Sequence, residues 1–216
     1  MIEVPENIPQ RKRLILGPLG RLLLKLFKWD ITGTIPNLKK MILIGAPHSA
    51  MRDAWYALLA VWALDLKVNF FGAAWVFTRL PSLFTISKNL DRQGIPWPLW
   101  WLQKYLMLKL GGIPVYRVNS KGLIRGAVEE FKTIDNYILV IAPEGGVEPV
   151  KQFRSGFYYL AKGLNIPYVP IEIDFKNRRF GIQDPKYITG TFEQESEKIA
   201  SLFSGVEGAT RTFKML

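Results

Sequence analysis

Short apolar runs alternate with longer mixed stretches along most of the chain. Apolar runs that end at turn-forming residues are typical of strands, whereas apolar positions spaced three and four residues apart are typical of helices. The runs predict strands at 31–35, 41–46, 67–71, 112–116, 137–142 and 168–173, and two late, antiparallel strands at 180–182 and 186–188. The mixed stretches predict helices at 14–29, 51–66, 97–110, 121–132 and 154–163.

A polar motif marks the start of one more helix. Thr191 is followed three residues later by Gln194, which resembles a capping box and predicts a helix that ends near Phe203. Strands separated by helices need crossover connections, so the order of elements predicts a largely parallel sheet. We therefore expect a single α/β domain with a mixed, mostly parallel sheet flanked by helices.

Two features of the sequence concern membranes and compartment. The longest uninterrupted apolar run, 54–64, has eleven residues, and a helix that spans a bilayer needs about twenty. The N-terminus places its basic cluster after prolines and acids and lacks a cleavage site, so it does not fit a signal peptide. We expect a cytoplasmic protein without a transmembrane helix.

The net charge and the scarcity of Cys and His limit which partners and which metal sites the protein could have. The 29 Lys and Arg residues exceed the 18 Asp and Glu residues, which gives a net charge of +11. Such a charge indicates an anionic partner, namely nucleic acid, an anionic membrane surface or a phosphorylated substrate, unless the protein is simply basic. The basic residues are dispersed and no nucleic-acid recognition motif is present, so no nucleic-acid partner is expected.

The residue counts also bear on metal binding. Because the chain has no cysteine and only one histidine, we expect no metal centre; composition leaves open only an all-carboxylate magnesium site.

The N-terminal residues 1–30 predict a separate role. The helix expected at 14–29 carries leucines on one side and Arg21, Lys25 and Lys28 on another. It could dock on anionic lipid at the inner face of the membrane, with 31–216 as the catalytic domain, or it could pack its leucines on the domain.

An aromatic cluster with nearby lysines likewise suits either a membrane interface or the core. It consists of Trp97, Trp100, Trp101 and Tyr105, with Lys104 and Lys109 beside them.

The only histidine lies between a predicted strand and a predicted helix. His48 follows the run 41–46, and Asp53 lies five residues further on. Parallel α/β sheets place reactive groups where strands end, and a carboxylate on one imidazole nitrogen leaves the other nitrogen free to act as a base. A lone histidine can equally be structural, so the pair by itself leaves both interpretations open.

Two further stretches could bind an anion. Glu144, Gly145 and Gly146 follow the predicted strand 137–142, where backbone amides can approach an anion and the acid can accept from a hydroxyl; the alternative is a tight turn. Arg117 follows the predicted strand 112–116 and could clamp a phosphate or be a surface charge.

Taken in order, these stretches resemble the glycerolipid acyltransferase family, which includes the 1-acyl-glycerol-3-phosphate acyltransferases. The resemblance rests on the HX4D motif of His48 and Asp53, then GGIPVYR, APEGG and VPI, and covers roughly 29–191, as in short bacterial lysophospholipid acyltransferases. It implies that His48 deprotonates the acceptor hydroxyl, which attacks the thioester of acyl-CoA or acyl carrier protein, while Asp53 orients the imidazole. It also implies that the acceptor phosphate is bound by Arg117, Glu144, Gly145 and Gly146, with Pro170 on the acyl-donor side or in packing. No cofactor is implied beyond the acyl donor as co-substrate.

The third block departs from the family pattern. It commonly reads EGTR, but here Gly146 and Val147 follow Gly145, so the arginine is missing. Lys151 or Arg154 could replace its charge. The sequence therefore predicts an O-acyltransferase for a lysophospholipid such as 1-acyl-glycerol-3-phosphate. The alternatives are a non-phosphate lipid acceptor, such as an aminolipid or glycolipid, and a membrane-binding module whose site has decayed.

Overall fold

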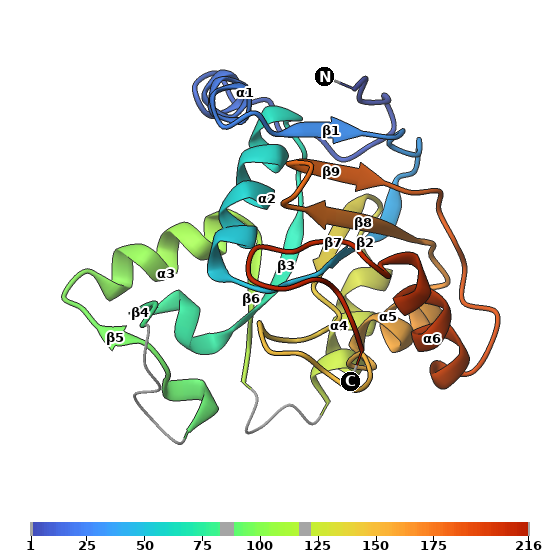
Figure 1. Cartoon of the computed structure of the whole chain (residues 1–216). Coiled ribbons are helices and arrows are strands. Elements are labelled where there is room, and N and C mark those ends of the chain that lie inside the picture. Colours follow the sequence, from blue (N-terminus) through green and yellow to red (C-terminus); the bar gives the residue numbers. More distant parts are fainter. Residues whose placement is uncertain (1, 83–88, 117–121, 216) are drawn as a thin grey trace.

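The structure is a computed structural model that describes residues 2–82, 89–116 and 122–215 (Figure 1). The α-helices are α1 (Leu16–Leu26), α2 (Met51–Ala63), α3 (Trp100–Lys109), α4 (Leu123–Lys132), α5 (Gly156–Leu164) and α6 (Phe192–Leu202). The strands are β1 (Asp30–Thr32), β2 (Lys40–Ala46), β3 (Asn69–Ala73), β4 (Arg79–Leu80), β5 (Ile95–Pro96), β6 (Gly112–Val115), β7 (Tyr137–Ile141), β8 (Tyr168–Asp174) and β9 (Arg179–Ile182). Two short 3₁₀ helices, η1 (Ala74–Phe77) and η2 (Leu90–Arg92), flank the hairpin strand β4.

Within the described residues, the main sheet has seven strands in the order β1-β9-β8-β2-β7-β3-β6. The five strands from β8 to β6 run parallel, whereas β9 is antiparallel to β8 and β1 is parallel to β9. This is the mixed, mostly parallel sheet that the sequence predicted. Because β2 lies between β8 and β7, the turn after β2 is close to the ends of both neighbours.

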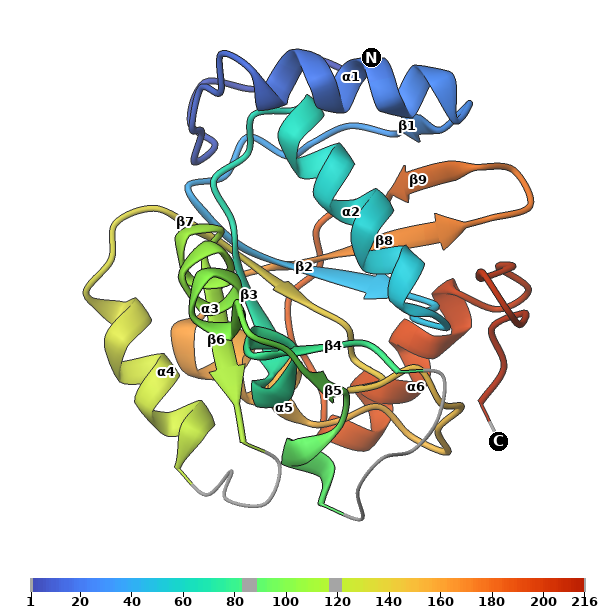
Figure 2. The same cartoon turned by 90° about the vertical axis from the view of Figure 1, so that its left-hand side faces the viewer.

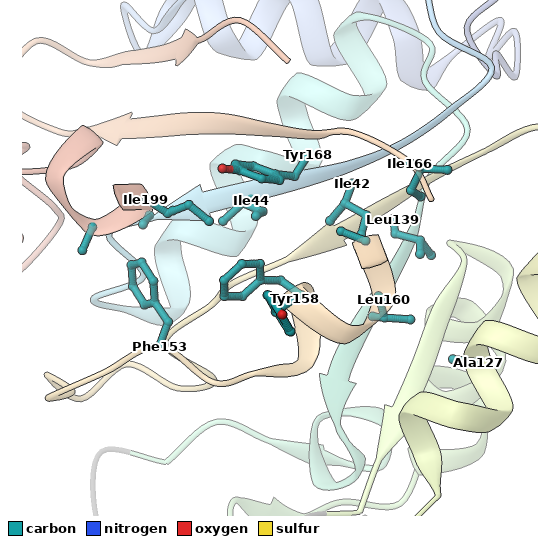
Figure 3. Close-up of a cluster of buried hydrophobic side chains, with 14 of the residues drawn as sticks. Ile42, Ile44, Ala127, Leu139, Phe153, Tyr158, Leu160, Ile166, Tyr168 and Ile199 are labelled. Carbon is teal, nitrogen blue, oxygen red and sulfur yellow. The ribbon is translucent and has the colours of Figure 1, made fainter. Parts of the chain in front are cut away.

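Helices cover both faces of this sheet (Figure 2). Alternation along β2 sends Met41 to the face covered by α1 and α2, and Ile42 to the face covered by α4, α5 and α6. On the second face, apolar side chains from β2, β7, β8 and the helices converge in one core, as Figure 3 shows for Ile44, Tyr168 and Ile199. Burial on both faces explains why these strands are continuously apolar in sequence.

Most predicted elements are present with shifted ends. The strand predicted at 67–71 occupies Asn69–Ala73, and the helix predicted at 97–110 begins only at Trp100. Antiparallel pairing of β9 with β8 and the capping box of Thr191 and Gln194 are confirmed. The strand predicted at 186–188 is wrong, because Lys186 makes only an isolated bridge with Tyr168 before the chain leaves the sheet.

Helix α1 packs on the molecule through Gly17, Gly20 and the buried Leu24, whereas Leu19, Leu22 and Leu26 are exposed. A Cβ at Gly20 would lie 2.8 Å from the backbone nitrogen of Ala63 in α2, so the two helix backbones touch. Arg21 donates to the Ala63 carbonyl (2.9 Å) and lies 3.7 Å from Asp65. The glycines that weaken the helix in isolation therefore permit its close approach to α2. None of the described helices is both long and apolar enough to cross a bilayer.

A buried carboxylate ties α6 to the amino end of β8. The Tyr168 hydroxyl donates to Oε2 of Glu195 (3.0 Å), and the N–H and hydroxyl of Thr189 donate to Oε1 (3.1 and 3.0 Å). Burial raises the pKa of Glu195, but these hydrogen bonds outweigh it and hold the pKa below its ordinary value of 4.5. A depressed carboxyl pKa contributes stability above the ordinary value, and that contribution is lost as the pH falls through the folded-state value.

We expect Glu195→Gln to lower the free energy of unfolding at neutral pH by about 1–3 kcal/mol, the range for losing charged hydrogen bonds. The variant should also lose less stability than the wild type as the pH falls below 4.5. Urea unfolding midpoints measured against pH test this, with the exposed Glu193→Gln in the same helical turn as the control. An unchanged slope in acid would contradict the assignment.

Candidate active site

The turn after β2 brings His48 and Asp53 together. Nδ1 of His48 lies 3.4 Å from Oδ2 of Asp53, with a histidine side chain that is 19% exposed beside a carboxylate that is almost fully buried. The separation is longer than a typical N–H···O hydrogen bond. Such contacts are often long in ligand-free enzymes and shorten when substrate binds.

Asp53 is fixed by the backbone around it. Its Oδ2 accepts from the N–H groups of Ser49 (2.6 Å) and Ala50 (2.8 Å) at the start of α2. This is half of a capping box, because alanine at the helix N-cap has no side-chain acceptor to complete it. Oδ1 of Asp53 is buried without a hydrogen-bond partner. These hydrogen bonds fix the orientation of the carboxylate beside the imidazole, and Oδ2 accepts both of them.

Glu144, three residues after the end of β7, contacts the turn that carries His48. It is only 2% exposed, and its Oε2 accepts from the backbone N–H of His48 at 2.6 Å. Its Oε1 accepts from Nη2 of Arg211 at 2.9 Å. Burial raises the pKa of Glu144, and the contacts with Arg211 and His48 offset part of that rise. Both carboxylate oxygens thus have partners within the protein, and Glu144 is hydrogen-bonded to the turn that carries His48, called here the histidine turn (residues 47–50).

The two glycines after Glu144 lie in a turn where Gly145 is exposed and Gly146 is partly buried. Gly145 has φ +69°, a conformation that favours glycine, and a Cβ there would lie 2.9 Å from Cγ of Arg154. The Arg154 side chain packs across Gly145, and the backbone N–H of Arg154 donates to the Pro143 carbonyl (2.8 Å). Arg154, one of the two cations named as replacements for the missing EGTR arginine, therefore lies against this turn. The predicted site residue Arg117 lies outside the described residues.

Residues near the C-terminus complete the site, and sequence reasoning missed them. The Thr210 N–H donates to Oγ of Ser49 (3.2 Å), and the Thr210 hydroxyl donates to the Ser49 carbonyl (2.8 Å). Arg211 pairs with Glu144, and Arg52 hydrogen bonds to the Ala209 carbonyl. No motif in the sequence marks this segment, because its contacts are made across 67 to 161 residues of chain.

An open hollow of about 480 Å³ adjoins the first turn of α2. Its lining includes the stacked rings of Trp29 and Tyr56, whose centroids lie 4.5 Å apart. Arg52 and Arg178 also line it and add positive charge. The lining is completed by Leu26, Phe27 and Phe175. Among the residues that the structure describes, no group of three or more acidic or histidine side chains could hold a metal ion.

Comparison with known proteins supports the architecture. No family model and no curated protein matches the sequence. The fold is similar to the crystal structure of the 1-acyl-sn-glycerophosphate (LPA) acyltransferase PlsC from Thermotoga maritima. The TM-score is 0.50 at 14% identity, over 87% of this chain and 75% of that chain. The chain therefore has an α/β fold, with a seven-stranded, mostly parallel sheet flanked by helices, that resembles an acyltransferase structure.

Proposed function

We propose that this protein is an O-acyltransferase that moves a fatty acyl group from a thioester to a hydroxyl of a lysophospholipid. The observation that carries the proposal is the pairing of His48 with the buried Asp53 at the carboxyl end of β2. The fold likeness to a lysophosphatidic acid acyltransferase agrees with it but concerns the fold alone.

The chemistry requires one base, and His48 can act as that base near neutral pH. Because Asp53 faces Nδ1, the proton rests on Nδ1 and Nε2 is free to accept from the acceptor hydroxyl. The alkoxide oxygen then attacks the thioester carbonyl, and the tetrahedral intermediate collapses with loss of the thiolate. The imidazolium returns its proton to that thiolate, so an ester and a free thiol leave the site.

Positive charge near the turn supports a phosphorylated acceptor. Arg154 lies across Gly145, and Arg52 and Arg178 line the hollow beside α2. Guanidinium groups bind phosphate through two parallel hydrogen bonds. The absence of the EGTR arginine, replaced at that block by Val147, favours the second candidate, a lipid acceptor without phosphate.

The function is tested by incubating the purified full chain with acyl-CoA or acylated carrier protein and a panel of lysolipids, and by measuring thiol release. The panel pairs phosphorylated acceptors with aminolipid and glycolipid acceptors of equal chain length. Turnover confined to the phosphorylated members supports the leading proposal, and turnover confined to the others supports the second. No thiol release with any pair would reject both.

We further propose that an anionic membrane is the surface on which the protein works. Large apolar side chains stand exposed on α1 and on α3, which has no buried residue. Arg11, five residues before the start of α1, donates to the Lys109 carbonyl at the end of α3, so the segment that precedes α1 reaches α3. Exposed apolar residues with lysines and arginines beside them fit the interface of an anionic bilayer. They are Leu14, Ile15, Leu19, Leu22, Leu26 and Phe27 near α1, and Trp100, Trp101, Tyr105, Leu106 and Leu108 on α3.

We expect the double variant Leu22→Glu/Leu26→Glu to weaken binding to anionic vesicles by about tenfold or more, because burial of one leucine contributes roughly 1.5–3 kcal/mol. These side chains are 62% and 68% exposed, so the fold should survive. Co-sedimentation with phosphatidylglycerol vesicles measures the effect. Tyr159→Glu, which alters an exposed aromatic residue on α5, is the control and should bind normally. Equal binding by both variants, or tight salt-sensitive binding to DNA instead of vesicles, would contradict the proposal.

A further inference from the structure

The segment after α6 folds back on the site as an anchored turn. The Gly208 N–H donates to the Arg211 carbonyl (2.9 Å), and the Phe213 N–H donates to the Val206 carbonyl (2.7 Å). The Phe213 ring is buried, 5.7 Å from the ring of Phe153 and 5.9 Å from that of Phe203. The turn is therefore held by core packing that is independent of its contacts with the site.

This turn contacts the histidine turn through backbone and side chain. Thr210 makes two hydrogen bonds with Ser49, the residue after His48. Space between the two turns is tight, since a Cβ at Gly208 would lie 2.7 Å from Oγ of Ser49 and 2.8 Å from Cγ of Pro47. The residues on either side of His48 are thus packed against the C-terminal segment.

Arg211 extends this contact to the residue beneath His48. Its Nη2 binds Oε1 of Glu144 at 2.9 Å, with side chains that are 18% and 1% exposed. Nε and Nη1 of Arg211 are buried without a hydrogen-bond partner, so the pairing with Glu144 is what holds the guanidinium. A buried carboxylate that lost its cation would be strongly destabilised or would take up a proton.

We propose that Arg211 is a positioning residue for acyl transfer, which keeps Glu144 ionised so that the carboxylate holds the backbone of His48 in place. The inference rests on the proposed function, in which His48 is the base. Glu144 faces His48 and Arg211, and each of its oxygens binds one of them. Arg211 therefore acts on the base through Glu144 and does not itself contact the reacting atoms.

The test compares Arg211→Ala, Arg211→Lys and Lys198→Ala. Lys198 lies 3.8 Å from another buried carboxylate, that of Glu195, which is bonded to the amino end of β8, so it is a matched control away from the site. We expect Arg211→Ala to lower kcat by about ten- to a hundredfold, the range for loss of a charged hydrogen bond, with little change in KM. Arg211→Lys should recover part of kcat, and Lys198→Ala should leave it unchanged.

Two further measurements separate positioning from a purely structural role. In the Glu144→Gln background, Arg211→Ala should cost much less in kcat, because the group through which it acts is altered. Exchange of the backbone amides of His48, Ser49 and Ala50 should accelerate in Arg211→Ala and not in Lys198→Ala. An equal loss of kcat in both backgrounds, or unchanged amide exchange, would overturn the proposal. If the wild type releases no thiol with any acceptor, the proposed function fails, whereas amide exchange still decides the role of Arg211.

Discussion

Replacement of His48 by alanine is expected to abolish thiol release almost completely. A positioned general base contributes about 10²–10⁴-fold to a rate, and His48 is the only histidine in the chain. The structure predicts that the variant still folds, since Glu144 binds the backbone N–H of residue 48 and not its imidazole. Initial rates with the best acceptor measure the effect, and the thermal midpoint should shift by only a few degrees.

Asp53→Asn is a companion to His48→Ala and tests whether the carboxylate charge assists the imidazole. Asparagine keeps the shape of the side chain and one oxygen that can accept from Ser49 and Ala50, but it loses the charge that stabilises the imidazolium. We expect a smaller loss of kcat than in His48→Ala. Wild-type turnover by His48→Ala would remove the histidine from the mechanism and with it the proposed function.

The largest effect on stability is expected at Phe157. This ring is fully buried in the core between the sheet and α5, where it lies 6.5 Å from the ring of Tyr168. Truncation of a buried phenylalanine to alanine costs about 3–5 kcal/mol, because contacts are lost and a cavity remains. For a domain of this size each kcal/mol lowers the thermal midpoint by roughly 2–4 °C. Differential scanning calorimetry of Phe157→Ala should therefore show a fall of about 6–20 °C.

Tyr159→Ala provides the control two residues further along α5. Its ring is 54% exposed, so truncation should change the free energy of unfolding by well under 1 kcal/mol. A similar loss of stability in both variants would mean that α5 does not bury the face described here.

The sequence predicted those parts of the fold that depend on local pattern. Continuous apolar runs identified β2, β7 and β8, because these strands are buried on both faces, and the Thr191 motif identified the start of α6. The spacing of His48 and Asp53 likewise follows from the start of a single helix. Such features depend on neighbours within a few residues, which the sequence displays directly.

Features that depend on distant contacts were not predictable in this way. Arg211 meets Glu144 only because the chain after α6 returns to the carboxyl edge of the sheet. The leucines of α1 were equally compatible with packing or exposure until the contact of Gly20 with α2 showed which face is inward. The apparent strand at 186–188 had the right composition, but it contributes only a single bridge.

If α1 rests on a membrane as proposed, the crossing of α1 and α2 fixes the height of His48 and Asp53 above the lipid. Gly20 touches α2 near Ala63, whereas Asp53 lies at the other end of that helix. At 1.5 Å per residue these points are separated by roughly 15 Å along the helix axis. On the proposal that α1 rests on the membrane, an acceptor would rise by a comparable height to reach His48, and each methylene that leaves the hydrocarbon costs about 0.8 kcal/mol. Single-chain lipids leave a bilayer more readily than double-chain lipids, so the proposed placement would favour lysolipids over their diacyl products.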